Sequence, residues 1–531
     1  MPFTAPSVSR ILSSIAILCV LTLPLHAQDF LTWHNNNART GFDSKETILT
    51  LANVNSTTFG KLFVVPADGL VDAQPLYLSN VSISGVIHNL LIVATEHDSV
   101  YAYDADTGAN LWQVTTLKSG ETTSDQRHCP QVEPEIGITS TPVIARPKTG
   151  DPVIYVVAMS KDSSANYHQR LHALDAATGA ERFNGPIDIS GQYPGTGDNS
   201  SGGYVIFDPA QYKERAALLM VGNTVYLAWA SHCDFRPYTG WIMGYNATTL
   251  AQTTILNLTP NGSQGALWNS GAGMAADNSG NIILLDANGV FDTTLTSSGF
   301  PDQGDYGNAF LRLTTTGGLA VADYFEMYNQ SSENSTDTDL GSGGALLTSQ
   351  KDSTGKIWQL AVGAGKDSNL YVVDRTNMGK FNSSSNHIYQ ELKSALREGV
   401  WSAPAAFNNL IYYGPKNEAI QAFQFSNAKL KSAAVAKTAN TFVYPGATPA
   451  ITSNGNQNAI LWAAENVNPA VLHAYNAKTL VELYNTNQAS GGRDQFGAGN
   501  KYITPMIANG KVYVGTTTGV GVFGLLSAPA K

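Results

Sequence analysis

The sequence has few charged residues and no cluster of basic ones. Asp, Glu, Lys and Arg make up 14% of the 531 residues, and the formal net charge is −10. Binding to nucleic acid or to an anionic membrane surface needs a basic patch, so we expect neither partner. No apolar run after residue 27 is long enough to cross a bilayer, so we expect no membrane span. The 49 glycines and abundant Ser, Thr and Asn residues are typical of an all-β exported protein.

The first 27 residues have the pattern of a secretion signal. Arg10 supplies a positive charge, residues 11–23 form an apolar run, and Ala27 is a small residue at a cleavage site. The cysteine inside this segment follows two large apolar residues, whereas lipid attachment needs small ones. We therefore predict a signal peptide at residues 1–27, no lipid anchor, and a single domain over residues 28–531 of a secreted or periplasmic protein.

Cysteine is scarce, and only Cys129 and Cys233 follow the predicted signal peptide. In an oxidising compartment, one disulfide between them is the favoured interpretation. Each cysteine also follows a histidine, His128 or His232, so a metal site with two Cys and two His ligands is the alternative. Neighbouring residues of an extended strand point to opposite faces, which makes an adjacent His-Cys pair a poor chelate.

A short phrase recurs along the chain. It consists of an apolar strand, an Asp or Asn that begins a turn, then Thr and often Gly, and a further apolar segment. Self-similarity on this scale indicates a stack of one supersecondary unit, which we interpret as the blade of a β-propeller. The copies are residues 100–112, 171–179, 242–250, 370–379 and 472–480.

The phrase has a physical cause in the turn at its centre. An Asp such as Asp104 can bond to backbone amides two or three residues further on. Gly108, Gly179 and Gly379 can take the positive φ that strains other residues. The alternative is generic hairpins in a β-sandwich, whose strands rarely repeat one turn phrase so often.

Eight units can be counted. The predicted unit starts are Gln74-Pro75, Thr141-Pro142, Ala217, Ser270, Ser342, Ala403-Pro404, Thr448-Pro449 and Thr504-Pro505. The last unit, residues 502–526, lacks a fourth strand, whereas residues 60–66 form a spare strand near the N-terminus. Pairing these two strands would leave no open edge. We predict an all-β, eight-bladed propeller of four-stranded antiparallel blades, closed in this way, with seven blades as the fallback.

The repeat resembles that of the pyrroloquinoline quinone (PQQ) β-propeller superfamily over nearly the whole chain after residue 27. That group includes alcohol dehydrogenases that use this quinone as well as non-catalytic scaffolds. In the dehydrogenases, a Trp lies under the quinone and an Asn binds Ca²⁺. An Asp acts as the base, and an Arg or Lys contacts the quinone oxygens. The resemblance therefore implies PQQ and Ca²⁺ as cofactors and an alcohol or sugar as substrate.

Four residues match this order and spacing, namely Trp268, Asn288, Asp339 and Lys366. An indole face stacks well on a flat quinone, and amide or carboxylate oxygens suit a hard cation. A lysine would place positive charge beside the quinone oxygen that becomes negative. The resemblance implies quinone binding by Trp268 and Lys366, metal binding by Asn288 and Asp339, and catalysis by Lys366 together with Asp339 as the proton acceptor.

Two further acids match the family less closely. Asp234 takes the place of a third Ca²⁺ ligand, and Asp72 matches an acid near the rim of the quinone. Each of the four residues above also has a purely structural interpretation. These are packing between blades for the Trp, a hairpin turn for the Asn, a turn cap for the Asp and a solvated charge for the Lys.

The chain departs from the dehydrogenases in its cysteines. They place two adjacent cysteines on the other face of the quinone, but this chain has no Cys-Cys pair, and Cys129 and Cys233 are far apart in sequence. It also has no Cys-x-x-Cys-His haem motif, so electrons would pass to an external acceptor. Two hypotheses follow. One is a quinoprotein dehydrogenase with a small-molecule substrate, and the other is a non-catalytic propeller whose loops bind a protein or glycan.

Overall fold

The computed structural model describes residues 1–4 and 28–527, so the predicted signal peptide lies, apart from its first four residues, outside the described residues. The described part of the chain is almost entirely β-structure. It contains ten sheets, of which eight have four or five strands in mainly antiparallel order. Within the described residues, no helix has both the length and the apolar character required to span a membrane.

The first four large sheets follow one another along the chain. Sheet 1 contains β3 (Leu76–Ile83), β4 (Val86–Ala94), β5 (Ser99–Asp104) and β6 (Asn110–Thr115). Sheet 2 contains β7 (Thr122–Thr123), β8 (Val143–Ala145), β9 (Val153–Lys161), β10 (Tyr167–Asp175) and β11 (Ile187–Asp188). Sheet 3 contains β16 (Leu219–Val221), β17 (Thr224–Ala228), β19 (Trp241–Asn246) and β20 (Gln252–Asn257). Sheet 4 contains β21 (Ala275–Ala276), β22 (Ile282–Leu285), β23 (Phe310–Thr314) and β24 (Ala320–Phe325).

The other four large sheets complete the sequence. Sheet 5 contains β25 (Leu346–Lys351), β26 (Ile357–Ala364), β27 (Leu370–Asp374) and β28 (Gln390–Leu392). Sheet 6 contains β29 (Ala405–Phe407), β30 (Leu410–Tyr413), β31 (Gln421–Ser426), β32 (Lys429–Leu430) and β33 (Ala436–Lys437). Sheet 7 contains β34 (Ala450–Asn454), β35 (Gln457–Glu465), β36 (Val471–Asn476), β37 (Glu482–Asn485) and the parallel strand β1 (Phe42–Asp43). Sheet 8 contains β38 (Met506–Ala508), β39 (Lys511–Gly515), β40 (Gly519–Leu525) and β2 (Phe59–Pro66).

Two small sheets and five short helices lie in the connections. The small sheets are formed by β12 (Gln192–Pro194), β13 (Ser200–Ser201) and β14 (Tyr204–Ile206), and by β15 (Tyr212–Lys213) with β18 (Ala230–Ser231). The helices are η1 (Asn269–Gly271), α1 (Gln330–Ser335), η2 (Leu340–Ser342), η3 (Thr486–Gln488) and η4 (Ser490–Gly492).

The predicted unit starts agree with the strands. All eight lie just before one strand of each large sheet, which we call the first strand of that sheet. These strands are β3, β8, β16, β21, β25, β29, β34 and β38. Proline is tolerated there because it has no amide hydrogen to contribute to a ladder and is confined to strand ends and edges.

The repeated turn is built as the sequence predicts. Oδ1 of Asp104 accepts the backbone amide of Thr107 at 2.8 Å, and the amide of Gly108 donates to the Asp104 carbonyl oxygen at 2.8 Å. Gly108 has φ +77°, in the left-handed region. In the copy that begins at Asn246, Leu250 takes the same place with φ +57°. The turn therefore depends on the Asp or Asn more than on the glycine.

The hydrophobic cores lie between consecutive sheets rather than inside one layer. From sheet 2 to sheet 8, every sheet shares a cluster of buried apolar side chains with the next sheet along the chain. A further cluster combines residues of sheets 1, 2 and 8, among them Leu76, Ile154 and Val520. The last sheet therefore packs against the first as the others pack against their neighbours.

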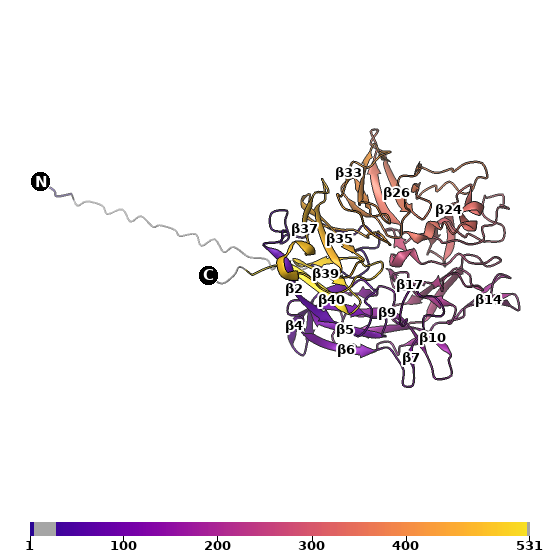
Figure 1. Ribbon diagram of the computed structural model, residues 1–531, viewed down its shortest axis with the longest axis horizontal. Coiled ribbons are helices and arrows are strands. Elements are labelled where there is room, and N and C mark those ends of the chain that lie inside the picture. The colour runs from indigo at the N-terminus through magenta and orange to yellow at the C-terminus, as the bar shows by residue number, and fades with distance from the viewer. Residues whose placement is uncertain (5–27, 528–531) are drawn as a thin grey trace.

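Strands from the two ends of the described chain pair with each other. β2 is antiparallel to β40 from Phe59 opposite Leu525 to Pro66 opposite Gly519, as predicted from residues 60–66. Figure 1 shows the indigo strands of sheet 1 beside the yellow strands of sheet 8, and the remaining sheets follow around the molecule in chain order.

Residues 30–43 contact the first strands of seven sheets in turn. Backbone carbonyl oxygens of this segment accept amides from six of these strands at 2.7–3.1 Å, and the Asn37 amide group donates to a carbonyl oxygen of sheet 3. In chain order, the amide donors are Tyr77, Ile144, Ala276, Leu347, Ala406 and Ile451. The first strands of sheets 1–7 therefore surround one N-terminal segment, which the repeat pattern did not predict.

Two fully buried basic side chains, Arg39 and His34, belong to this segment. Arg39 donates to the carbonyl oxygens of Met274 at 2.8 Å and Leu218 at 3.2 Å. One nitrogen of the His34 ring lies 2.8 Å from the carbonyl oxygen of Pro449, and the other lies 3.0 Å from that of Arg39. Burial lowers the pKa of His34 to about 4 and that of Arg39 to about 9. These contacts connect the segment to sheets 3, 4 and 7.

Candidate functional site

Polar and aromatic side chains surround a cavity of about 590 Å³, which we call the main cavity. This volume lies within the range of small-molecule and cofactor sites. The connections between sheets supply most of its wall, so residues far apart in the sequence face one space. They include Cys129, Lys213, Arg215, Cys233, Asp234, Trp268, Asp337, Asp339, Lys366, Trp401, Tyr444 and Tyr502.

One part of the wall is aromatic. The rings of Trp268 and Tyr502 meet edge to face with their centres 6.2 Å apart, and those of Trp401 and Tyr444 do so at 6.0 Å. The hydroxyl groups of Tyr444 and Tyr502 lie 2.8 Å apart and connect the two pairs. Trp268 is only half-buried, so part of its indole is available to a planar ligand.

Trp268 is positioned by the residues that follow it. The amide of Asn269 donates to three buried carbonyl oxygens at 2.9–3.1 Å, which belong to Leu285, Gly341 and Gly343. Asn269 has φ +42° and Ser270 has φ +51°. Non-glycine residues rarely adopt this left-handed conformation, so the surrounding bonds hold a backbone that would not form by itself.

The loop with Asp337 and Asp339 lies between α1 and η2. The hydroxyl of Ser342 donates to the Asp339 carbonyl oxygen at 3.1 Å and to that of Val400 at 2.7 Å. Asp337 also takes the left-handed conformation, with φ +55°. The Ser342 side chain therefore connects this loop to the Val400 backbone, which precedes β29 of sheet 6.

Lys366 lies in the turn between β26 and β27 and bridges the carboxylates of Asp337 and Asp339. Its Nζ is 2.8 Å from Asp339 Oδ2 and 2.9 Å from Asp337 Oδ1, and it lies 5.7 Å from the centre of the Trp268 ring. Its backbone amide also donates to the Asp339 carbonyl oxygen at 3.0 Å. Any Cβ at Gly365 would come within 2.4 Å of that oxygen, so only glycine permits this approach.

Burial and charge act in opposite directions on the pair. Burial raises the pKa of Asp339 to about 6, although the Lys366 ammonium lowers it. Burial lowers the pKa of Lys366, but the two carboxylates raise it further, and the net pKa lies above its ordinary value. At neutral pH the pair is therefore an aspartate and an ammonium ion.

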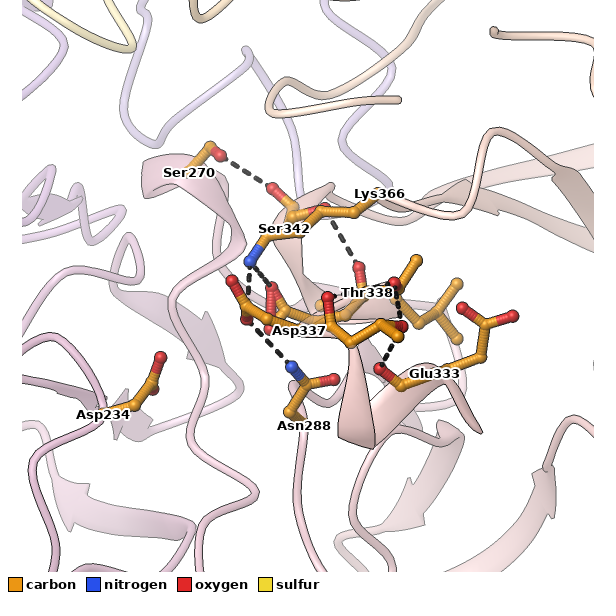
Figure 2. Close-up of polar contacts among 12 residues, drawn as sticks. Asp234, Ser270, Asn288, Glu333, Asp337, Thr338, Ser342 and Lys366 are labelled. Atoms are coloured by element: carbon orange, nitrogen blue, oxygen red, sulfur yellow. Dashed lines mark hydrogen bonds and ion pairs between the residues drawn. The ribbon is translucent and has the colours of Figure 1, made fainter. Parts of the chain in front are cut away.

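Asn288 completes the group of oxygen donors. Its amide nitrogen donates to Asp337 Oδ1 at 3.0 Å, and its side-chain oxygen is buried without a hydrogen-bond partner. Figure 2 shows Asn288 and Lys366 converging on Asp337. Amide and carboxylate oxygens are the donors that a hard cation prefers, so their chemistry fits Ca²⁺. In the part of the chain that the structure describes, no three His, Cys, Asp or Glu side chains are grouped to hold a metal ion.

The other two predicted acids lie elsewhere. Asp234 lines the main cavity, but Figure 2 shows it apart from Asn288 and Asp337. It accepts hydrogen bonds from Ser231 and Tyr238. Asp72 lies behind the wall. Its Oδ2 is 3.6 Å from Arg215 Nη1, and its Oδ1 accepts from Asn500 at 2.6 Å. The metal role of Asp234 and the cofactor role of Asp72 stay predictions.

The predicted disulfide between Cys129 and Cys233 is confirmed, and it closes a sequence separation of 104 residues. The bond leaves neither sulfur as a thiolate for the alternative metal site. The sequence did not place the two cysteines, whereas the structure puts both in the wall of the main cavity. Two cysteines that are far apart in the sequence thus both line the cavity, although this chain has no two adjacent cysteines.

Sequence reasoning missed several cavity residues, most clearly Lys213 and Arg215. The only signal was a short charged run, residues 213–215, directly before an apolar strand. Tyr502 was also missed, although the guanidinium carbon of Arg215 lies 4.5 Å from the centre of its ring. No repeat or spacing marks these positions, because residues 213–215 and Tyr502 lie in connections outside the repeated phrase.

Solved structures of similar fold include dehydrogenases. The quinohemoprotein alcohol dehydrogenase from Comamonas testosteroni matches with a TM-score of 0.62 at 16% identity, covering 95% of this chain and 82% of that one. A europium-containing methanol dehydrogenase matches with a TM-score of 0.62 at 14% identity, covering 94% and 98%. This chain has the fold of the PQQ-type β-propeller proteins. No protein-family model matches it, and no curated protein sequence does so either. At this identity, likeness to these dehydrogenases establishes the fold alone, and any chemistry has to be inferred from the residues of the main cavity.

Proposed function

We propose that this PQQ-type propeller is a secreted or periplasmic dehydrogenase that oxidises an alcohol or sugar in the main cavity, with PQQ and Ca²⁺ as cofactors. The observation that carries the proposal is the Lys366–Asp339 ion pair at 2.8 Å beside the half-buried Trp268 ring. An acid, a fixed positive charge and a flat aromatic face are thereby combined in one cavity of cofactor size.

We further propose that the eight large sheets are blades of one closed ring. Three observations support this. Consecutive sheets share apolar cores, sheet 8 shares one with sheet 1, and residues 30–43 contact the first strands of sheets 1–7 in chain order. Closure would also explain why connections from sheets far apart in sequence surround a single cavity.

The cavity has residues suited to both cofactors. PQQ is planar and anionic, so the Trp268 face would stack on it, and Lys366 and Arg215 would supply positive charge. Oxygens of Asn288 and Asp339, together with those of Asp337, would hold Ca²⁺. When bound, the quinone accepts the two electrons and the hydrogen removed from the substrate carbon, and Ca²⁺ makes it more electrophilic.

The chain itself supplies the proton acceptor. Because its pKa is about 6, Asp339 is largely ionised at neutral pH and can accept the proton of a substrate hydroxyl group. Lys366 keeps that carboxylate oriented through one ion pair and one backbone hydrogen bond. The same ammonium favours negative charge that develops near it in the cavity.

The test is reconstitution of the purified exported protein with PQQ and Ca²⁺, followed by dye-linked oxidation of a panel of alcohols and sugars. We expect saturable quinone binding and substrate-dependent dye reduction, both diminished in Lys366→Met. The matched control is Lys356→Met, which removes an exposed lysine above the Trp358 ring in sheet 5 and leaves the cavity intact. Absence of quinone binding and of dye reduction in the wild type would favour the non-catalytic propeller that binds a protein or glycan.

A further inference from the structure

Lys213 is a buried amine that the proposed dehydrogenase chemistry does not use. It ends the short strand β15, its residue is only 3% exposed, and it lines the main cavity. Within the described residues 28–527, burial and the charges of neighbouring groups act on its Nζ, and no hydrogen bond to that atom is present. A lysine is almost never buried without a partner, so this amine has a ligand-facing position that packing does not explain.

The charges around Lys213 favour its neutral form. Burial lowers the pKa of Lys213 to about 7, and the charge of Arg215 acts in the same direction. The carboxylates of Glu96 and Asp72 raise the pKa of Lys213, but by less than burial lowers it. A lysine that is desolvated and adjacent to another cation is the classical form of a nucleophilic amine. The titratable groups that act on it are Arg215, Glu96, Asp72, Lys501 and His232.

Arg215 offers a second, independent observation. It is buried, and its Nε and Nη1 have no hydrogen-bond acceptor. Asp72 is too distant to serve, because its nearest oxygen lies 3.6 Å from Nη1. A guanidinium with free donors binds a carboxylate through two parallel hydrogen bonds. Lys213 and Arg215 are two residues apart and both line the main cavity, so one small ligand can reach both.

We propose that Lys213 and Arg215 form a covalent binding site for a small carbonyl compound that carries a carboxylate, such as an aldehyde acid. Arg215 binds the carboxylate, and Nζ of Lys213 attacks the carbonyl carbon. A C–N bond forms while one proton of the neutral amine moves to the carbonyl oxygen, which becomes a hydroxyl group. The hydroxyl group then leaves as water with the second proton of the nitrogen, and an imine remains. The condensation is reversible and needs neither an oxidant nor a reductant. It does not depend on the proposed quinone chemistry.

The experiment uses the full exported chain without added quinone or metal. Glyoxylate is the probe and acetaldehyde the neutral control, and sodium cyanoborohydride converts any imine to a stable amine. Peptide mass mapping measures labelling at Lys213 relative to the exposed Lys148 and Lys431 in the same sample. At pH 7 the neutral fraction of an amine with a pKa near 7 exceeds that of an ordinary lysine on the order of 1,000-fold. We therefore expect Lys213 to be labelled at least about tenfold faster than either exposed lysine.

Two further readouts separate the amine from the anion site. The labelling rate of Lys213 should rise through a pH of about 7, whereas that of exposed lysines rises only near 10. The ratio of Lys213 to surface labelling should be higher with glyoxylate than with acetaldehyde. In Arg215→Gln that preference should disappear, and the pH midpoint should move upward. Labelling of Lys213 no faster than Lys148, or no preference for glyoxylate in the wild type, would overturn the proposal. Neither result depends on whether the protein oxidises alcohols.

Discussion

Lys366 and Asp339 are joined twice, once through an ion pair of 2.8 Å between their side chains and once through a backbone hydrogen bond of 3.0 Å. The ion pair keeps the ammonium and carboxylate groups in contact, and the backbone hydrogen bond fixes the distance between the two loops. Because Asp339 is fully buried, its carboxylate keeps its charge only through this ammonium. The pair is therefore the part of the main cavity in which a small change has the largest expected effect.

Asp339→Asn should abolish most of the proposed oxidation while quinone binding persists. The amide is similar in shape to the carboxylate but cannot accept the hydroxyl proton. General base catalysis contributes roughly 100- to 10,000-fold, so we expect kcat to fall within that range. Asp151→Asn is the control, because its side chain is exposed and does not line the main cavity. Equal losses in both variants would contradict the distinct role of Asp339.

The proposed activity should decline as the pH falls through about 6, where Asp339 becomes protonated. The Lys366 ammonium lowers the pKa of Asp339, so Lys366→Met should move this acidic limb to higher pH. Steady-state kcat/KM measured between pH 5 and 9 tests both statements. An acidic limb that stays in place in the variant would show that another group titrates.

Trp268→Ala should weaken quinone binding. Stacking on an indole contributes about 0.5–1.5 kcal/mol beyond the buried area, so roughly a tenfold rise in Kd is expected. Titration with PQQ, followed by intrinsic fluorescence, measures it. Trp358→Ala in sheet 5 is the matched control, since Trp358 packs against Tyr389 and does not line the main cavity. Similar losses in the two variants would mean that the quinone does not stack on Trp268.

Removing the disulfide with the double change Cys129→Ser and Cys233→Ser should lower the free energy of unfolding. A closed loop of about 100 residues corresponds to about 4–5 kcal/mol in the chain-entropy description, and 2–5 kcal/mol is the typical range. Urea unfolding of the variant, compared with the wild type before and after reduction, tests this. If reduction destabilises the variant as much as the wild type, the bond is not the cause.

Arg39→Met should destabilise the protein without touching the main cavity. The change removes donors from buried carbonyl oxygens of Met274 and Leu218, which lie next to different sheets. Leaving such acceptors unpaired costs about 1–3 kcal/mol each. Lys148→Met on the surface is the control. An unchanged midpoint of thermal unfolding in Arg39→Met would show that residues 30–43 do not stabilise the assembly of sheets.

The repeated phrase predicts the strands and turns well because the hydrogen bonds of its turn join residues that are close in the sequence. The Asp104 carboxylate and the amide of Thr107 are three residues apart, so their hydrogen bond can be predicted from the local sequence. The starts of the large sheets could be predicted for the same reason. The path of residues 30–43 could not, because its carbonyl oxygens bond to strands from 47 to 410 residues away, such as Tyr77 and Ile451.

The candidate site shows the same division. Trp268 and Lys366 could be named because the family order and spacing mark them, and the structure brings both to one cavity. Lys213 and Arg215 could not, since nothing in residues 213–215 distinguishes them from a solvated charged turn. Their significance comes from burial, which the sequence does not report.

By itself, the sequence determined the strands and the turns and favoured the disulfide between Cys129 and Cys233, because neighbouring residues and residue types suffice for these. Only the tertiary structure decided which charges meet. The pKa of Lys213 and the pairing of Lys366 with Asp339 depend on desolvation and on Coulomb energy, and both depend on distance through space rather than along the chain.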